Sequence, residues 1–198
     1  EFKHLSHLRY ETILNLCHKF QVEIPHAEHV KRMTLKIFDA LASFHKLGNW
    51  EREMLEAAAL LHDSGYMISH DQHHRHSYYL ITHSDMPGFT NDEAEIIGNI
   101  ARYHRKSHPK KKHIEFSSMH SQKQEVVKIL SGILRLGEGI DRRRRQFVED
   151  IEISVDGKKV KIKLIGSPDG IRPDIEVWGA NRRVNLLEES LGIKITVH

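Results

Sequence analysis

The stretch Ala57-Ala58-Ala59-Leu60-Leu61-His62-Asp63 ends an apolar helical run on an imidazole beside a carboxylate. Burying either group without a partner is costly, so a partner is expected nearby. A divalent metal ion satisfies both groups at once, because it binds neutral imidazole and ionised carboxylate together. The doublet His62-Asp63 therefore predicts a metal site at the end of a buried helix, where Ser64-Gly65 turns the chain.

The composition describes a globular chain with no membrane segment. Of the 198 residues 39% are hydrophobic and 29% are charged, and no apolar run approaches the roughly 20 residues of a membrane span. Cys17 is the single cysteine, which fits a reducing cytoplasm. Basic residues gather in two blocks, 102–112 and 142–145. Such blocks are usually solvated surface, and they also suit a polyanionic ligand.

The hydrophobic periodicity predicts a mostly α protein. Apolar residues recur at helical spacing up to about residue 145, and the segment from about 121 to 145 is apolar on two faces, which predicts a centrally buried helix. From residue 149 the pattern alternates instead, with a hairpin turn at Asp156-Gly157. We expect a helical bundle over 1–148 and a small α+β unit over 149–198. This unit should hold about four strands, near 151–155, 160–164, 175–177 and 193–197, and one helix over 181–191.

Several candidate metal ligands share one placement. Each of four predicted helices carries, in line with its apolar stripe, a group that can bind a metal: His26, His62, His104, and Glu138 or Asp141. Side chains of facing helices in a bundle can converge on one point, so the recurrence favours a shared site. The alternative is that each histidine is an ordinary core or surface residue, since the chain has 17 of them. His29, one turn after His26, is a competing candidate.

Two sets of segments resemble known families. Three are similar to the successive motifs of the HD-domain superfamily: His26-Ala27-Glu28-His29-Val30, Leu61-His62-Asp63-Ser64-Gly65 and Leu134-Arg135-Leu136-Gly137-Glu138-Gly139-Ile140-Asp141. Others resemble the C-terminal region of exopolyphosphatase and guanosine pentaphosphate phosphatase proteins: Ile68-Ser69-His70, His74-Arg75-His76-Ser77-Tyr78-Tyr79-Leu80-Ile81, Pro87-Gly88-Phe89 and Ala101-Arg102-Tyr103-His104-Arg105-Lys106. The second resemblance runs over essentially the whole chain and implies an HD-type bundle.

The resemblance implies a metal centre and a phosphate pocket. Its metal ligands would be His26, His62, Asp63 and either Glu138, where the superfamily usually has Asp, or Asp141, with His76 and His104 available for a second ion. The ion would be Mn, Fe, Mg, Zn or Ni, and it would activate water for attack on phosphorus. His62 and Asp63 would carry the catalysis, with Asp63 bridging two ions. Phosphate oxygens would be bound by basic side chains: His74, Arg75, Arg102, Arg105 and Lys106.

These features support three functions, in decreasing order. The first is a metal-dependent phosphohydrolase that acts on a phosphoanhydride or phosphoester, such as polyphosphate or a guanosine polyphosphate. The second is a non-catalytic polyphosphate-binding and dimerisation module of a longer exopolyphosphatase, because the glycine-rich phosphate loops of that family's N-terminal actin-like domains are absent from the sequence. The third, nucleic-acid binding, ranks last because few aromatics accompany the basic blocks. We expect a homodimer that binds polyphosphate or a phosphorylated nucleotide and acts in the cytoplasm.

Overall fold

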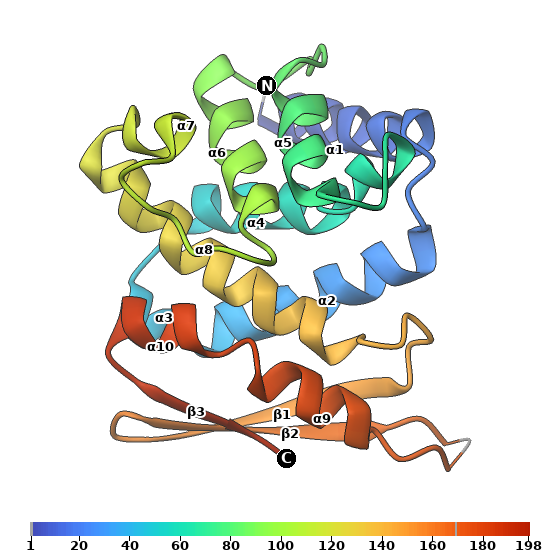
Figure 1. Cartoon of the computed structure of the whole chain (residues 1–198), viewed down its shortest axis with the longest axis vertical. Coiled ribbons are helices and arrows are strands. Elements are labelled where there is room, and N and C mark those ends of the chain that lie inside the picture. The colour runs from blue at the N-terminus through green and yellow to red at the C-terminus, as the bar shows by residue number, and fades with distance from the viewer. Residues whose placement is uncertain (1, 169) are drawn as a thin grey trace.

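Helices make up most of the chain, and one long helix runs through their middle (Figure 1). The computed structural model describes residues 2–168 and 170–198. Its elements follow the order α1 (Phe2–Lys19), α2 (Ile24–Ala40), α3 (Ala42–His45), α4 (Asn49–Leu61), η1 (Ser64–Met67), α5 (His73–Thr82), α6 (Asn91–Arg102), α7 (Ile114–Ser117), α8 (Ser121–Ile140), β1 (Val148–Asp156), β2 (Lys159–Gly166), α9 (Asp174–Asn181), α10 (Asn185–Leu191) and β3 (Lys194–Val197). A mostly α architecture followed by a small α+β unit is thus confirmed.

The central helix is α8, which contacts α2, α4, α6, α9 and α10. Its apolar side chains are buried around the whole helix: Val127, Leu130, Ile133, Leu134, Leu136 and Ile140. The predicted central burial is therefore confirmed, but the helix ends at Ile140 and not near residue 145. Residues 141–147 instead form a loop in which Arg144 and Gln146 adopt left-handed backbone conformations, with φ of 56° and 52°. This loop returns the chain toward the start of α2.

The close crossing of α2 and α8 requires a residue without a side chain, Gly137, on α8. A Cβ built at Gly137 would lie 2.1 Å from Oγ1 and 3.3 Å from Cα of Thr34 on α2. Since real side chains do not approach so closely, only glycine lets the two helix backbones meet at this point. The close crossing brings the start of α2 beside the end of α8, where several of the candidate ligands lie.

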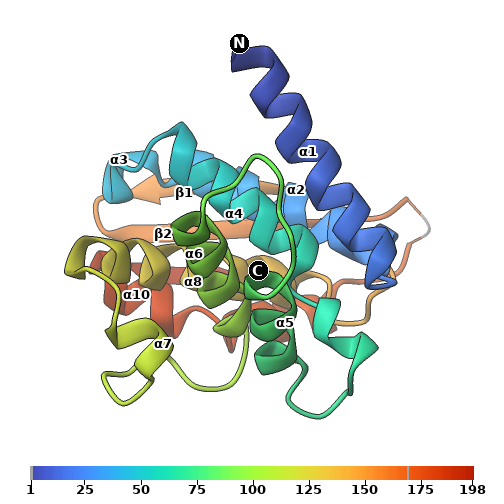
Figure 2. The same cartoon turned by 90° about the horizontal axis from the view of Figure 1, so that it is seen from above.

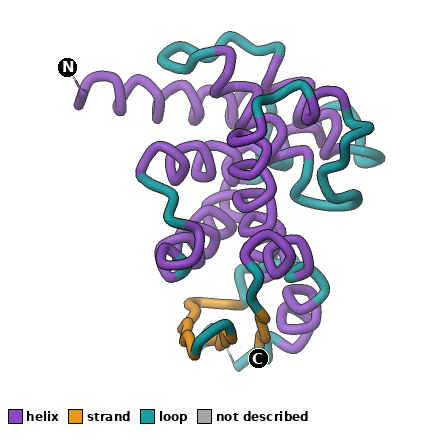
Figure 3. The backbone as a smooth tube through the Cα atoms, turned by 90° about the vertical axis from the view of Figure 1, so that its left-hand side faces the viewer, coloured by secondary structure: helices purple, strands orange, loops and turns teal. Residues whose placement is uncertain are grey.

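The last fifty residues form a three-stranded sheet with two helices on it. β1 pairs with β2 in antiparallel register, with Val155 opposite Val160, and β2 pairs with β3 in parallel. The turn predicted at Asp156-Gly157 is confirmed. Figure 3 shows the strands gathered at one end of the molecule, below the helices. One continuous cluster of buried apolar side chains runs through both parts of the chain, and the division at residues 148–149 stays a prediction.

The strand expected at 175–177 is wrong, because this segment lies in α9. Its two apolar residues alternate, and a run this short does not separate a strand from a helix by period alone. Asp174 and Glu176 in the first turn suit a helix N-terminus, and Glu176 is fully buried in a bidentate ion pair with Arg143. The helix expected over 181–191 is shorter and begins at Asn185. The described part of the α+β unit therefore has three strands and two helices.

The first helix extends beyond the rest of the bundle, as two perpendicular views show (Figures 2 and 3). Its second half packs on α4 through buried residues that include Ile13, Leu16 and Cys17. Leu5 and Leu8, nearer its start, are more than 40% exposed. In the described ranges no helix combines the length and the apolar character needed to cross a membrane.

Replacing Gly137 tests the close crossing. Gly137→Ala should lower the free energy of unfolding by about 1–3 kcal/mol, because the new methyl group overpacks the α2–α8 contact although alanine is the better helix former. Urea denaturation followed by circular dichroism measures the change. Gly166→Ala is the control, since a Cβ there would meet its neighbours at 3.4 Å or more. Equal stability of the two variants would contradict the crossing.

Candidate metal centre

Four segments bring buried imidazoles to one carboxylate. His62 directly follows α4 and precedes Asp63, and His26 lies in the first turn of α2. His73 is the first residue of α5, and His104 comes two residues after α6 ends. All five side chains are buried. The helices α4 and α6 are in contact, and their carboxyl-terminal ends lie near each other, with the ring centres of His62 and His104 4.9 Å apart.

The carboxylate of Asp63 lies between two pairs of histidine nitrogens. Its Oδ2 atom is 3.5 Å from Nε2 of His26 and 3.4 Å from Nε2 of His62. Its Oδ1 atom is 3.2 Å from Nε2 of His73 and 3.6 Å from Nε2 of His104. Each oxygen thus forms, with one histidine pair, a three-atom group whose ligand atoms all lie within 4.8 Å of one another. Asp63 belongs to both groups.

In three of these rings Nδ1, the nitrogen that does not face Asp63, is fixed by a hydrogen bond. Nδ1 of His62 donates to the carbonyl oxygen of Ala59 at 2.6 Å, and Nδ1 of His104 donates to that of Ala101 at the same distance. Nδ1 of His26 lies 2.7 Å from Oδ2 of Asp141. These bonds turn the Nε2 atoms toward the centre, the arrangement that outer partners impose on metal-binding histidines. Within residues 2–168 and 170–198, Nε2 of His26 and of His62 is buried and has no hydrogen-bond partner.

The electrostatics suit ligands for a cation. Burial lowers the pKa of His62, and it lowers the pKa of His104 well below the ordinary value, so both rings are neutral near pH 7. Burial also acts to raise the pKa of Asp63, but the imidazoles around it, first His62, and the guanidinium of Arg144 hold that pKa well below its usual range. Neutral imidazole beside ionised carboxylate is the protonation state that a divalent ion needs.

The structure brings together four of the predicted ligands, His26, His62, Asp63 and His104. His76, predicted for a second ion, is half-buried and belongs to neither described group, and His73 lies there instead. The sequence reasoning missed His73 because it depends on where α5 begins. The left-handed Gln72, with φ of 52°, starts the helix at His73, so His73 lies at the start of α5 beside Asp63, and His76 lies about one turn further along the helix.

The two late carboxylates have other partners. Asp141 accepts hydrogen bonds from the backbone N–H and the side-chain amide of Gln146 at 2.8 and 2.9 Å, besides its contact with His26. Glu138 forms an ion pair with Arg183 at 2.9 Å. Neither residue belongs to a described ligand group. Asp141 is placed to orient His26, and His29 is bonded through Nε2 to the carbonyl oxygen of Val148.

The turn that follows His62-Asp63 requires a glycine at position 65. A Cβ at Gly65 would lie 2.0 Å from the carbonyl oxygen of His73 and 2.6 Å from the backbone nitrogen of Ser77. The Ser77 hydroxyl also accepts from the Gly65 N–H and donates to the carbonyl oxygen of His62. These backbone contacts hold α5 against the end of α4. They are what place His73 opposite Asp63.

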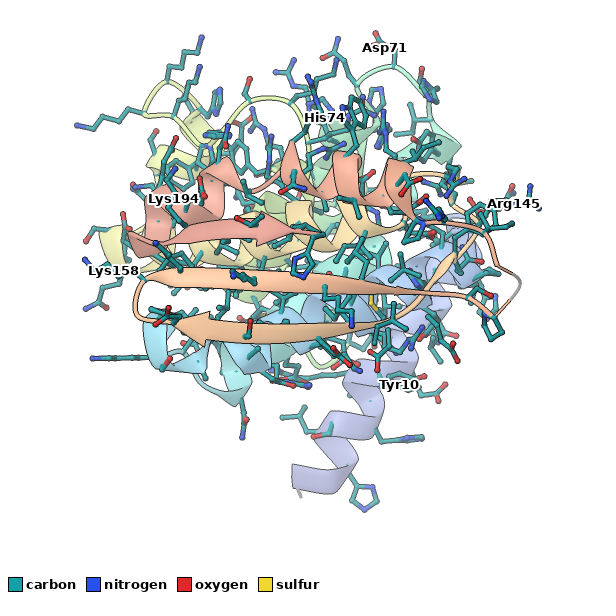
Figure 4. All side chains as sticks on the ribbon, turned by 90° about the horizontal axis from the view of Figure 1, so that it is seen from below. Tyr10, Asp71, His74, Arg145, Lys158 and Lys194 are labelled. Atoms are coloured by element: carbon teal, nitrogen blue, oxygen red, sulfur yellow. The ribbon has the colours of Figure 1, made fainter. Side chains whose placement is uncertain are left out.

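The predicted phosphate-binding residues surround a basic cavity next to this centre. Its volume is about 500 Å³, and its walls include most of the predicted set and further polar groups: Asp71, Gln72, His74, Arg75, Arg102, Tyr103, Lys106, Ser107, Lys112 and His113. Arg105 is not part of the wall, and its guanidinium lies 3.2 Å from Nδ1 of His73. Burial and the nearby arginines lower the pKa of His74 to about 4. Figure 4 shows Asp71 and His74 on one side of the molecule, far from Tyr10 of α1.

Comparison with known proteins agrees with this architecture. Residues 8–191 match the family described as Ppx/GppA phosphatase, domain III, and the chain belongs to that family. Two similar curated proteins are both named guanosine-5'-triphosphate,3'-diphosphate pyrophosphatase. The protein of Pseudoalteromonas atlantica is 29% identical over 150 residues, 73% of this chain and 29% of the relative. That of Vibrio vulnificus is 26% identical over 159 residues, 79% of this chain and 31% of the relative. The chain spans less than a third of the length of these relatives.

The role of Asp141 can be tested through stability. Asp141→Ala should lower the free energy of unfolding in EDTA by about 3 kcal/mol, because Gln146 loses two bonds and Nδ1 of buried His26 loses its partner. Glu149→Ala, at an exposed position in the same region, should change it by less than about 0.5 kcal/mol. Urea titrations of both variants measure the difference. A neutral Asp141→Ala would show that this carboxylate does not hold the loop.

Proposed function

We propose that this domain is an HD-type, metal-dependent phosphohydrolase. The observation that carries the proposal is the position of Asp63, whose two carboxylate oxygens each face a separate pair of buried imidazole nitrogens. A structural ion pair would need one partner for this carboxylate and would leave no imidazole nitrogen unpaired. The unpartnered Nε2 atoms of His26 and His62 fit a cation that this donor set would hold.

The residues fit two divalent ions. His26, His62 and Oδ2 of Asp63 would hold the first, and His73, His104 and Oδ1 of Asp63 would hold the second, with Asp63 common to both sets. Mixed nitrogen and oxygen donors suit Mn, Fe, Zn or Ni better than Mg, which favours oxygen. When bound, such ions supply Lewis acidity and a water of lowered pKa.

The chain's own groups would bind and orient the substrate. Lys106 and Arg75 on the wall of the basic cavity would neutralise phosphate oxygens, and Arg105 lies between this wall and His73. The relatives are named for hydrolysis of a guanosine polyphosphate, and this cavity is large and basic enough for several phosphates. The proposed substrate class is therefore a phosphoanhydride, either inorganic polyphosphate or a guanosine polyphosphate.

Metal content tests the ligand assignment. After loading with Mn²⁺ and dialysis, elemental analysis should find two ions per chain in the wild type. His26→Ala and His73→Ala should each lose about one ion, because each removes a ligand from a different group. His76→Ala is the matched control and should retain both ions. Two ions in His73→Ala together with loss in His76→Ala would overturn the assignment.

Turnover tests the catalytic role. With Mn²⁺ the chain should release phosphate or pyrophosphate from at least one of polyphosphate, guanosine tetraphosphate or guanosine pentaphosphate. Asp63→Asn should lower this rate at least about 100-fold, because the bridging charge between the ions is lost. Product release is measured by ion chromatography, with His76→Ala as the variant expected to keep activity.

The second candidate function is a polyphosphate-binding and dimerisation module. The basic cavity favours it, because binding there needs no metal chemistry. The same panel separates the two roles. Polyphosphate binding that weakens steeply with salt, without turnover in the metal-loaded chain, would replace the catalytic proposal by this one.

A further inference from the structure

An arginine outside the predicted site reaches its central carboxylate. Nη1 of Arg144, in the loop after α8, donates to Oδ2 of Asp63 at 2.6 Å. This is the oxygen that faces His26 and His62, the first of the two ligand groups. The guanidinium therefore stands at the position from which a cation would bind that oxygen.

A second contact holds the same side chain at the mouth of the site. Nε and Nη2 of Arg144 lie 2.8 and 2.7 Å from Oε2 of Glu23, the residue just before α2. The guanidinium also lies 5.5 Å from the ring centre of Tyr66. Its backbone has φ of 56°, a conformation that arginine seldom adopts, and its N–H donates to the carbonyl oxygen of Asp141. The loop thus aims one arginine at Asp63 at some conformational cost.

The contact lies on the floor of a cavity. A space of about 360 Å³ opens above Asp63, and its lining includes Glu23, Tyr66, His70 and Arg144. Arg144 and Asp63 both line this space, so an anion that enters it comes within reach of the guanidinium. The cavity is separate from the basic one at His74 and Lys106, since the two share no lining residue.

We propose that Arg144 competes with the first metal ion for Oδ2 of Asp63 and, once displaced, binds a phosphate group at the mouth of the site. The inference rests on the proposed metal centre. A guanidinium and a divalent ion on one carboxylate oxygen repel each other strongly in a site shielded from water. Metal binding therefore requires Arg144 to leave Asp63, while Glu23 keeps the guanidinium at the cavity. At the cavity, the planar set of N–H donors of the guanidinium matches the oxygens of a phosphate group.

Metal affinity tests the competition. Calorimetric titration of EDTA-stripped protein with Mn²⁺ should give an affinity about tenfold higher in Arg144→Met than in the wild type, because the competitor is gone. Arg145→Met is the matched control. It removes the same charge from the neighbouring, exposed residue, which lies at the edge of the molecule in Figure 4 and contacts Phe147. It should change the affinity by less than about threefold.

The affinity for inorganic phosphate tests the second part of the proposal, that the displaced Arg144 binds a phosphate group. In protein loaded with stoichiometric Mn²⁺, inorganic phosphate should bind about tenfold more weakly to Arg144→Met than to Arg145→Met, because only the first loses the phosphate donor. Equal phosphate affinity would overturn the phosphate role. Equal Mn²⁺ affinity of the two variants would overturn the competition but leave the metal centre standing.

Failure of the proposed metal centre would give a different result from failure of the proposed role of Arg144. If the wild type and both variants take up no Mn²⁺, the metal centre itself is wrong, and the role of Arg144 falls with it. If Arg144→Met loses the helical circular dichroism signal, Arg144→Lys against Arg145→Lys gives the same comparison. The shorter lysine lacks the fork that joins Asp63 to Glu23, so Mn²⁺ should again bind more tightly to the variant at position 144.

Discussion

The buried carboxylate of Asp63 is the constraint on which this structure depends. Asp63 lies two residues after the end of α4 and beneath the surface, where an isolated charge would cost far more than a domain of this size can supply. Its compensation comes from α2, α5 and the turn after α6, and from the loop after α8. The bundle must therefore bring together elements that are up to 120 residues apart in sequence before Asp63 can be buried.

The two helices that end at the centre use the same local device. His62 and His104 each bond through Nδ1 to the carbonyl oxygen three residues earlier, one of the carbonyls that a helix end leaves free. The bond satisfies a carbonyl at the helix terminus and leaves Nε2 facing Asp63. Because the carboxyl-terminal ends of α4 and α6 lie near each other, both nitrogens face the carboxylate of Asp63. Helix capping and ligand placement are here the same interaction.

Periodicity was enough to predict this convergence but not its details. Side chains in line with a buried stripe face the same core, and the structure brings His26, His62 and His104 together around Asp63. The hydrophobic periodicity could not distinguish His73 from His76, since that choice rests on the left-handed backbone of Gln72. Nor could it show that α8 stops at Ile140, which turns Arg144 back toward Asp63. Both differences lie in loops with left-handed residues, Gln72 before α5 and Arg144 and Gln146 after α8, whose backbone conformation carries no periodic signal.

The C-terminal unit contacts the segments that surround the centre. Arg183, between α9 and α10, pairs with Glu138 and donates to the carbonyl oxygen of His104. Arg143 joins the loop after α8 to the fully buried Glu176 of α9. These contacts fix the segment that carries Arg144 and the turn that carries His104. A change in how the sheet and its helices pack would therefore move groups on both sides of Asp63.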